Sequence, residues 1–146
     1  SGLTARQIKT CYFYATEQHV RSKFRRTLAD KNNTIIMEQA HLKESIQKLA
    51  QVLKEGKNIV IFPEGSRTHD GELGDFKLSF AILSKELDIP IIPVCIRGAY
   101  NALPRHRKYL YPRHIEVHYL PPVIPTSDIT YQQLADKVKQ AIARVL

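Results

Sequence analysis

Apolar residues recur along the chain with two different spacings. Short runs of β-branched, aromatic and other apolar residues predict strands at residues 11–15, 34–37, 58–62, 90–96 and 115–120. The middle three runs are almost continuously apolar, which is typical of strands buried on both faces of a parallel sheet. Apolar residues three and four positions apart predict helices at residues 17–30, 41–55, 76–87 and from 130 onward.

The order of these elements predicts the fold class. Strands that alternate with helices favour an α/β domain whose central sheet is mostly parallel and flanked by helices. Gly56 is a natural stop for the second helix, and Thr130 with Gln133 forms a capping-box pattern before the last one. No repeat and no Pro/Gly/Ser-rich linker divides the chain, so we expect residues 1–146 to form one domain.

Composition narrows the class of protein. Hydrophobic residues make up 43% and charged residues 25% of the chain, as in an ordinary globular protein. No apolar run approaches the roughly 20 residues of a membrane-spanning helix, and the first ten residues lack the apolar core of a signal peptide. Cys11 and Cys95 lie in apolar runs without a Cys-x-x-Cys spacing, so we expect buried, reduced thiols and no structural zinc.

The net charge of +8 points to an anionic partner. A basic chain can bind nucleic acid, a membrane surface or a phosphorylated substrate. The alternative is that the basic residues simply form a solvated face and bind no partner. Basic residues gather in the helix predicted at 17–30, namely Arg21, Lys23, Arg25 and Arg26. They also gather in the segment 100–114, which holds three tyrosines and has no clear period. A loop of that length is often functional.

The most informative stretch is the turn that follows the third predicted strand. The turn contains Pro63, Glu64, Gly65, Ser66 and Arg67. In an open α/β sheet, ligands bind beyond the carboxyl ends of the strands. Gly65 lets the backbone approach a ligand, Arg67 offers donors that suit a phosphate, and Ser66 adds a hydroxyl. The alternative is an ordinary strand-ending turn with a solvated arginine.

The surrounding residues favour the phosphate-binding interpretation. Residues 62–67 resemble the third motif of the glycerolphosphate and lysophosphatidic acid acyltransferase family. Residues 71–77 are similar to that family's Gly-x-Leu-x-x-Phe-Lys segment, and residues 89–94 with Gly98 are similar to its fourth motif. These three motifs follow one another in the family's order, within a resemblance that covers most of residues 11–125.

The resemblance implies a phospholipid-synthesis acyltransferase. Such an enzyme transfers a fatty acyl group from acyl-CoA or acyl carrier protein to the hydroxyl of a glycerol-phosphate or lysophospholipid acceptor. The acceptor phosphate would be bound by Glu64, Gly65, Ser66 and Arg67. Further candidates for substrate or surface contact are Lys77 and Arg97. No cofactor or metal is implied. Residues 102–105 and the Pro121-Pro122 turn are similar to members in which this domain is fused to others, and the sequence leaves open whether the full protein has further domains.

The family's catalytic base, a His in a His-x4-Asp motif, has no match here. None of the six histidines is followed by an aspartate at the fifth position. The chemistry needs this pair, because the acceptor hydroxyl must lose its proton and the Asp holds the imidazole in place. In the family the motif precedes the first strand. We therefore expect an N-terminally truncated, partial domain that holds no catalytic residue and does not turn over alone.

Other residues depart from the family or invite another interpretation. Gln39 stands where the second motif usually has an arginine, so one phosphate contact is expected to be missing, and Arg97 is a candidate to replace it. His114 and His118, placed on one strand, would lie about 13 Å apart, too far for one metal ion. A phosphate-orienting or turn-capping role is expected for Glu64 and Asp70.

We expect the domain to act peripherally at the cytoplasmic face of an anionic membrane, with Phe24, Tyr109, Leu110 and Tyr111 at the interface. No nucleic-acid partner is expected. The alternative function is a noncatalytic module that binds anionic lipid or acyl carrier protein.

Overall fold

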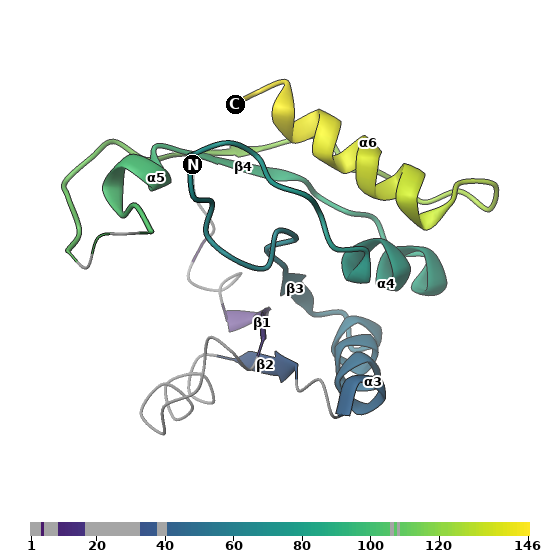
Figure 1. Ribbon diagram of the computed structural model, residues 1–146. Helices are drawn as coiled ribbons and strands as arrows, with labels where there is room; N and C mark the ends of the chain where they lie inside the picture. The colour runs from purple at the N-terminus through teal and green to yellow at the C-terminus, as the bar shows by residue number, and fades with distance from the viewer. Residues whose placement is uncertain (1–3, 5–8, 17–32, 38–40, 106, 108) are drawn as a thin grey trace. The chain divides into compact units, whose positions relative to one another are not determined.

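The computed structural model describes residues 4, 9–16, 33–37, 41–105, 107 and 109–146 (Figure 1). The chain divides into two compact units, Ser1–Phe62 and Pro63–Leu146. The helix predicted at residues 17–30, with its basic residues and Phe24, lies outside the described residues, as does Gln39.

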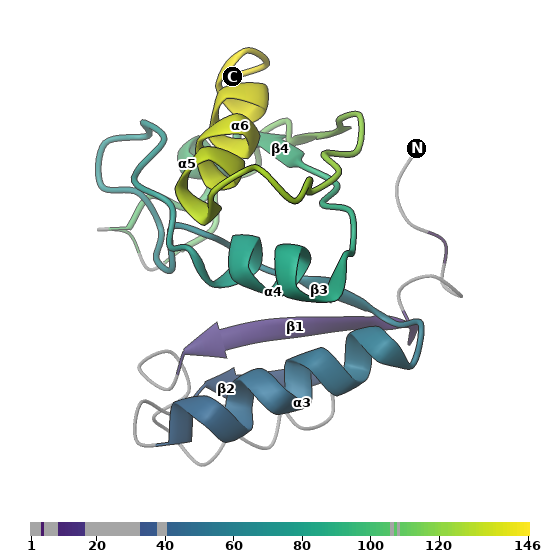
Figure 2. The same cartoon turned by 90° about the vertical axis from the view of Figure 1, so that its right-hand side faces the viewer.

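The first unit is a small parallel sheet covered by one helix. Its strands are β1 (Cys11–Thr16), β2 (Thr34–Met37) and β3 (Asn58–Val60), in the order β2-β1-β3. Both strand pairs are parallel. Helix α3 (Leu42–Lys54) packs against β2 and β3 (Figure 2), and its Leu49 is fully buried. The parallel sheet and its α/β class are confirmed.

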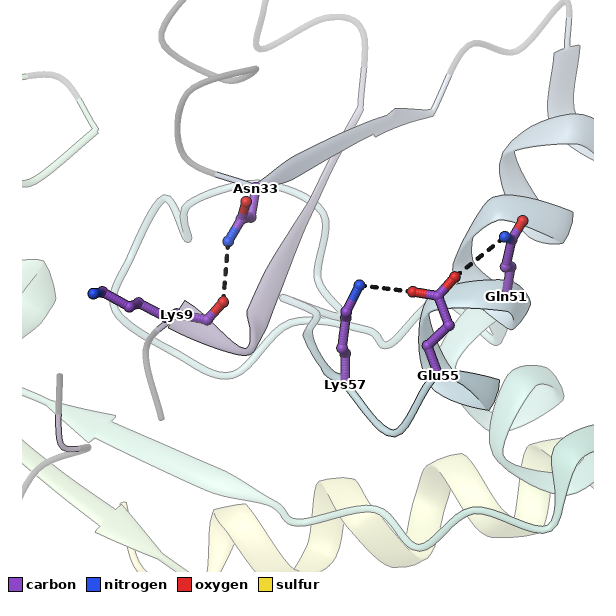
Figure 3. Close-up of polar contacts among 5 residues, drawn as sticks. All are labelled: Lys9, Asn33, Gln51, Glu55 and Lys57. Carbon is purple, nitrogen blue, oxygen red and sulfur yellow. Dashed lines mark hydrogen bonds and ion pairs between the residues drawn. The ribbon is translucent and has the colours of Figure 1, made fainter. Parts of the chain in front are cut away.

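Polar contacts fix the ends of elements in this unit (Figure 3). The carboxylate of Glu55 accepts from Gln51 Nε2 at 3.2 Å and from Lys57 Nζ at 2.6 Å, which ties the end of α3 to the start of β3. The side-chain amide of Asn33 donates to the backbone oxygen of Lys9 at 3.4 Å, which links the residues before β2 and β1. The helix stops at the predicted glycine, because Gly56 has a left-handed φ of 73°.

The second unit combines three helices with an antiparallel pair of strands. Its elements are α4 (Ser79–Leu87), β4 (Val94–Arg97), α5 (Ala99–Ala102), β5 (Glu116–Tyr119) and α6 (Tyr131–Ala143). Helices α4 and α6 pack together (Figure 1). The buried apolar residues of this unit include Phe80, Leu83, Cys95, Leu134 and Val138. Within the described residues, no helix is long and apolar enough to span a bilayer.

The expectation that the fourth predicted strand is buried on both faces of a parallel sheet is wrong. β4 pairs antiparallel with β5, with Arg97 opposite Glu116. Along β4, Cys95 is 1% exposed and its neighbour Ile96 is 40% exposed, so one face is covered. A continuous apolar run does not encode strand direction, and the segment after β4 returns the chain alongside it. Both cysteines are buried and unpaired, as predicted.

Local chemistry explains the boundaries of the other elements. β4 begins at Val94 and not at residue 90, because prolines 90 and 93 have no N–H for a ladder. Ile91 instead exchanges two backbone hydrogen bonds with Val123, at 2.9 and 2.8 Å. The capping box predicted before α6 is confirmed, since the side chains of Thr130 and Gln133 each accept from the other's backbone N–H.

Candidate functional site

Residues 63–75 form a loop that leads toward α4. The backbone N–H of Lys77 donates to the carbonyl oxygen of Pro63 at 2.9 Å, so the two ends of the loop lie together. Because this bond holds Lys77 outside the helix, α4 begins at Ser79 and not at Phe76 as predicted. The Pro-Glu-Gly-Ser-Arg motif therefore sits in a loop that is closed at its base.

Gly65 has a left-handed φ of 71°, which residues with a β-carbon rarely adopt. The side chain of Lys77 lies directly against it. A β-carbon added to Gly65 would come within 2.7 Å of the Lys77 Nζ and 2.9 Å of its Cε. The glycine thus allows an ammonium group to lie on the backbone of the motif. The sequence predicted Gly65 as the point of close approach, and the structure brings Lys77 to that point.

Glu64 connects two parts of the loop that are ten residues apart. Its Oε2 accepts a hydrogen bond from the backbone N–H of Gly74 at 2.9 Å. A β-carbon on Gly74 would lie within 2.9 Å of the same oxygen, so a side chain there would make the carboxylate shift. A carboxylate in this position stabilises the shape of the loop that presents Ser66 and Arg67.

Asp70 caps a tight turn within the loop. Its carboxylate accepts from the Thr68 hydroxyl at 2.8 Å and from the Glu72 backbone N–H at 3.0 Å. These hydrogen bonds favour the ionised form, the Glu72 contact most, and lower the pKa of Asp70. Gly71 completes the turn with a φ of 95°. The predicted Asp-Gly turn and its capping carboxylate are confirmed.

A second segment, residues 100–105, contacts the loop although it lies more than 30 residues away in the sequence. Arg67 Nη1 donates to the backbone oxygen of Leu103 at 3.3 Å, and Arg105 Nη1 donates to the backbone oxygen of Arg67 at 3.3 Å. Arg105 Nη1 also lies 2.7 Å from Nε2 of His69, and the Tyr100 hydroxyl donates to the His69 carbonyl at 3.0 Å. A guanidinium only donates, so this His69 nitrogen accepts.

An open hollow of about 340 Å³ lies against the loop, and Ser66 and Arg67 are exposed along it. Its lining also contains carboxylates. Those of Glu64 and Asp70 accept the hydrogen bonds described above, and that of Asp75 forms a 3.0 Å ion pair with Lys139. Ser66 and Arg67 bring a hydroxyl and a guanidinium group to this hollow, whose lining also includes Glu72.

Arg97 lies in the β4–β5 ladder with an acidic partner of its own. Its Nη1 is 3.7 Å from Oε2 of Glu116. Nε2 of His114 and of His118 lie 3.3 and 3.1 Å from the same carboxylate. The hydrogen bond from His118, aided by the charges of Arg97 and both histidines, lowers the pKa of Glu116. The expectation that both histidines lie on one strand is wrong, because β5 begins at Glu116.

Sequence reasoning missed the roles of Arg105, Tyr100, His69 and Gly74 as supports of the loop. Each contact joins residues at least ten positions apart, so no local spacing marks it. The signals for Arg105 were its place in a basic, aromatic segment, interpreted as a surface for an anionic partner, and the resemblance of residues 102–105 to the family; neither pointed to a contact with the loop.

Comparisons with known proteins agree with this architecture. A family model described as Acyltransferase matches residues 2–97. A 1-acyl-sn-glycerol-3-phosphate acyltransferase from Limnanthes douglasii is 35% identical over 97 residues, which are 66% of this chain and 34% of that protein. The alpha form from Homo sapiens is 28% identical over 97 residues, covering 64% and 34%. The chain thus spans about a third of the length of these relatives.

A solved structure shows the same fold. The crystal structure of the 1-acyl-sn-glycerophosphate acyltransferase PlsC from Thermotoga maritima superposes with a TM-score of 0.78 and 24% sequence identity. The match covers 93% of this chain and 55% of that one. Because the family model spans more than half of its residues, the chain belongs to the acyltransferase family, which includes the 1-acyl-sn-glycerol-3-phosphate acyltransferases.

Proposed function

We propose that the chain is the acceptor-binding part of an enzyme of phospholipid synthesis. The enzyme transfers a fatty acyl group from acyl-CoA or acyl carrier protein to the hydroxyl of a phosphorylated glycerol or lysophospholipid. The names of the relatives support this reaction and, among acceptors, a 1-acyl-glycerol 3-phosphate. The observation that carries the proposal is the placement of Lys77 against Gly65, beside the exposed Ser66 and Arg67.

The acceptor phosphate lies at Arg67, Ser66 and Lys77 in this proposal. Arg67 uses one N–H on the Leu103 carbonyl and keeps others for phosphate oxygens. Charge-assisted hydrogen bonds of this kind are the stronger class in proteins. Glu64 contributes by holding the loop, since its carboxylate accepts from Gly74 and would repel a phosphate at close range.

Holding the phosphate fixes the position of the free hydroxyl, which lowers the entropic cost of the reaction. The hydroxyl oxygen then forms a bond to the thioester carbonyl carbon, and the carbon–sulfur bond breaks. The hydroxyl proton passes to the base and then to the departing thiolate. We propose that this base is the histidine of a His-x4-Asp pair that precedes the 146 residues of this chain.

The test is an acyl-transfer assay on the protein extended by its natural upstream residues. With acyl-CoA and lysophosphatidic acid, the extended protein is expected to form the diacyl product, and the 146-residue chain is expected to form none. Arg67→Gln should lower kcat/KM about tenfold or more, because it removes a charged hydrogen bond to the acceptor. Arg144→Gln removes an exposed arginine at the end of α6, outside this loop, and as the matched control should change kcat/KM little.

Two results would contradict the proposal. An extended protein that transfers no acyl group to any glycerol phosphate or lysophospholipid would favour a noncatalytic binding module. Turnover by the 146-residue chain alone would show that the base lies within it.

A further inference from the structure

The loop between α5 and β5 exposes apolar side chains at its tip. Tyr109 is 80% exposed and Leu110 is 72% exposed, the two highest values among the large apolar side chains that the structure describes. The neighbouring Tyr111 and Ile115 are exposed as well. We call residues 103–115 the α5–β5 loop. Adjacent exposed apolar residues of this size are typical of a binding surface.

The tip is held in this exposed position by hydrogen bonds at the base of the loop. The backbone N–H of Tyr111 donates to Ala102 at 2.8 Å, and that of Arg107 donates to Pro104 at 3.0 Å. Arg107 Nη1 also donates to the Tyr111 hydroxyl at 2.8 Å. The chain extends outward beyond α5 (Figure 1), and Leu110 remains largely exposed to solvent.

The charge around the tip has one sign. No aspartate or glutamate occurs between Asp88 and Glu116. The exposed arginines of the loop are Arg105, Arg107 and Arg113, and the sequence places Lys108 between them. A loop that carries both exposed apolar side chains and exposed arginines fits a surface that is apolar inside and anionic outside.

We propose that the α5–β5 loop docks the protein onto an anionic lipid bilayer. Tyr109 and Leu110 enter the interface, where an aromatic ring with a polar end and an aliphatic side chain both find a favourable environment. The arginines contact lipid phosphates, and each basic residue near such a surface adds to the attraction. A nucleic acid fits the loop less well, because its bases could stack on the tyrosines but would give Leu110 no apolar environment.

This inference rests on the proposed function, because the α5–β5 loop is hydrogen-bonded to the loop of residues 63–75, where the acceptor phosphate is proposed to bind. Arg105 donates to the Arg67 carbonyl, and Arg67 donates to Leu103. The segment that carries Tyr109 is therefore joined by these two hydrogen bonds to the loop that holds the proposed phosphate donors.

Co-sedimentation with vesicles tests the proposal on the 146-residue chain. The vesicles are phosphatidylcholine alone or phosphatidylcholine with phosphatidylglycerol, neither of which is a lysophospholipid acceptor. We expect binding to the anionic vesicles that weakens with added salt. The double variant Tyr109→Ser/Leu110→Ser should bind roughly tenfold more weakly or worse, because it loses the apolar contact. Arg113→Gln should weaken binding about fivefold.

The controls match each change in chemistry. Ile124→Ser removes an apolar side chain that is 63% exposed, and Lys137→Gln removes an exposed charge from α6. Both should bind vesicles like the parent. Circular dichroism melts establish that all variants fold.

Equal binding to neutral and anionic vesicles would overturn the proposal. So would a double variant that binds like the parent, or a parent that binds acyl carrier protein or RNA but no vesicle. Calorimetry with a soluble short-chain lysophosphatidate, without vesicles, tests the acceptor site independently of the membrane. If the parent binds anionic vesicles but not this lysophosphatidate, the proposed acceptor site is wrong and the docking surface is retained.

Discussion

The ammonium group of Lys77 lies against the backbone of Gly65, where a β-carbon would come within 2.7 Å of it. Gly65→Ala should therefore displace Lys77 and also strain a backbone with a φ of 71°. We expect the backbone strain alone to lower the free energy of unfolding by about 1 kcal/mol. Acceptor binding should fall in addition, because the cation moves away from the motif.

Gly56→Ala separates these two effects. Gly56 has nearly the same φ, 73°, but a β-carbon there would meet nothing within 4 Å. It should cost similar backbone strain and leave acceptor affinity unchanged, as measured by calorimetry. An equal loss of affinity in both variants would show that Lys77 does not contribute at the site.

Glu64 holds the loop through the Gly74 amide, so its role is testable by two substitutions. Glu64→Ala leaves that N–H without its acceptor and should destabilise the protein by about 1 kcal/mol, with weaker acceptor binding. Glu64→Gln retains an oxygen acceptor and should keep much of the affinity. If both variants lose affinity equally, the negative charge itself matters, and the supporting role proposed for Glu64 is wrong.

Gly98 should tolerate no side chain. A β-carbon at this position would lie 2.2 Å from the backbone oxygen of His114, and the φ of 81° adds strain. We expect Gly98→Ala to lower the free energy of unfolding by about 3 kcal/mol, which urea denaturation can measure. A change below that of Gly56→Ala would mean that the β4–β5 connection adapts freely.

Glu116 should give the stability of the protein a dependence on pH in the acid range. Its pKa is lowered by the hydrogen bond from His118 and by the charges of Arg97 and His114, so folding favours the carboxylate. This contribution is complete above the unfolded-state value of about 4.3 and is lost as the pH falls through the lowered value. The melting temperature of the parent should exceed that of Glu116→Gln at pH 6, and the gap should close in acid. A gap that stays constant to pH 2 would contradict the assignment.

The sequence predicted those features that depend on neighbours along the chain. Thr130 and Gln133 are three residues apart, so the capping box that starts α6 was visible. Asp70 and Gly71 encode their turn in the same local way. Gly65 was recognised because a short motif placed it after an apolar strand, and its φ is left-handed as that role requires.

Features that depend on distant residues were not predictable in this way. The antiparallel direction of β4 depends on how the 98–115 segment returns, and an apolar run carries no direction. Arg105 supports the loop through a contact with His69, which lies 36 residues earlier in the chain. Glu64 was assigned to the phosphate by resemblance, whereas its observed contact is a backbone amide that only the fold brings near.

The most direct test of the acceptor site is calorimetric titration of the 146-residue chain with a soluble short-chain lysophosphatidate. The parent and Arg144→Gln, which changes an exposed arginine at the end of α6, are expected to bind it alike. Arg67→Gln is expected to bind at least tenfold more weakly. Equal affinity for the parent and Arg67→Gln, or no binding by a parent that is folded, would contradict a phosphate site at this loop.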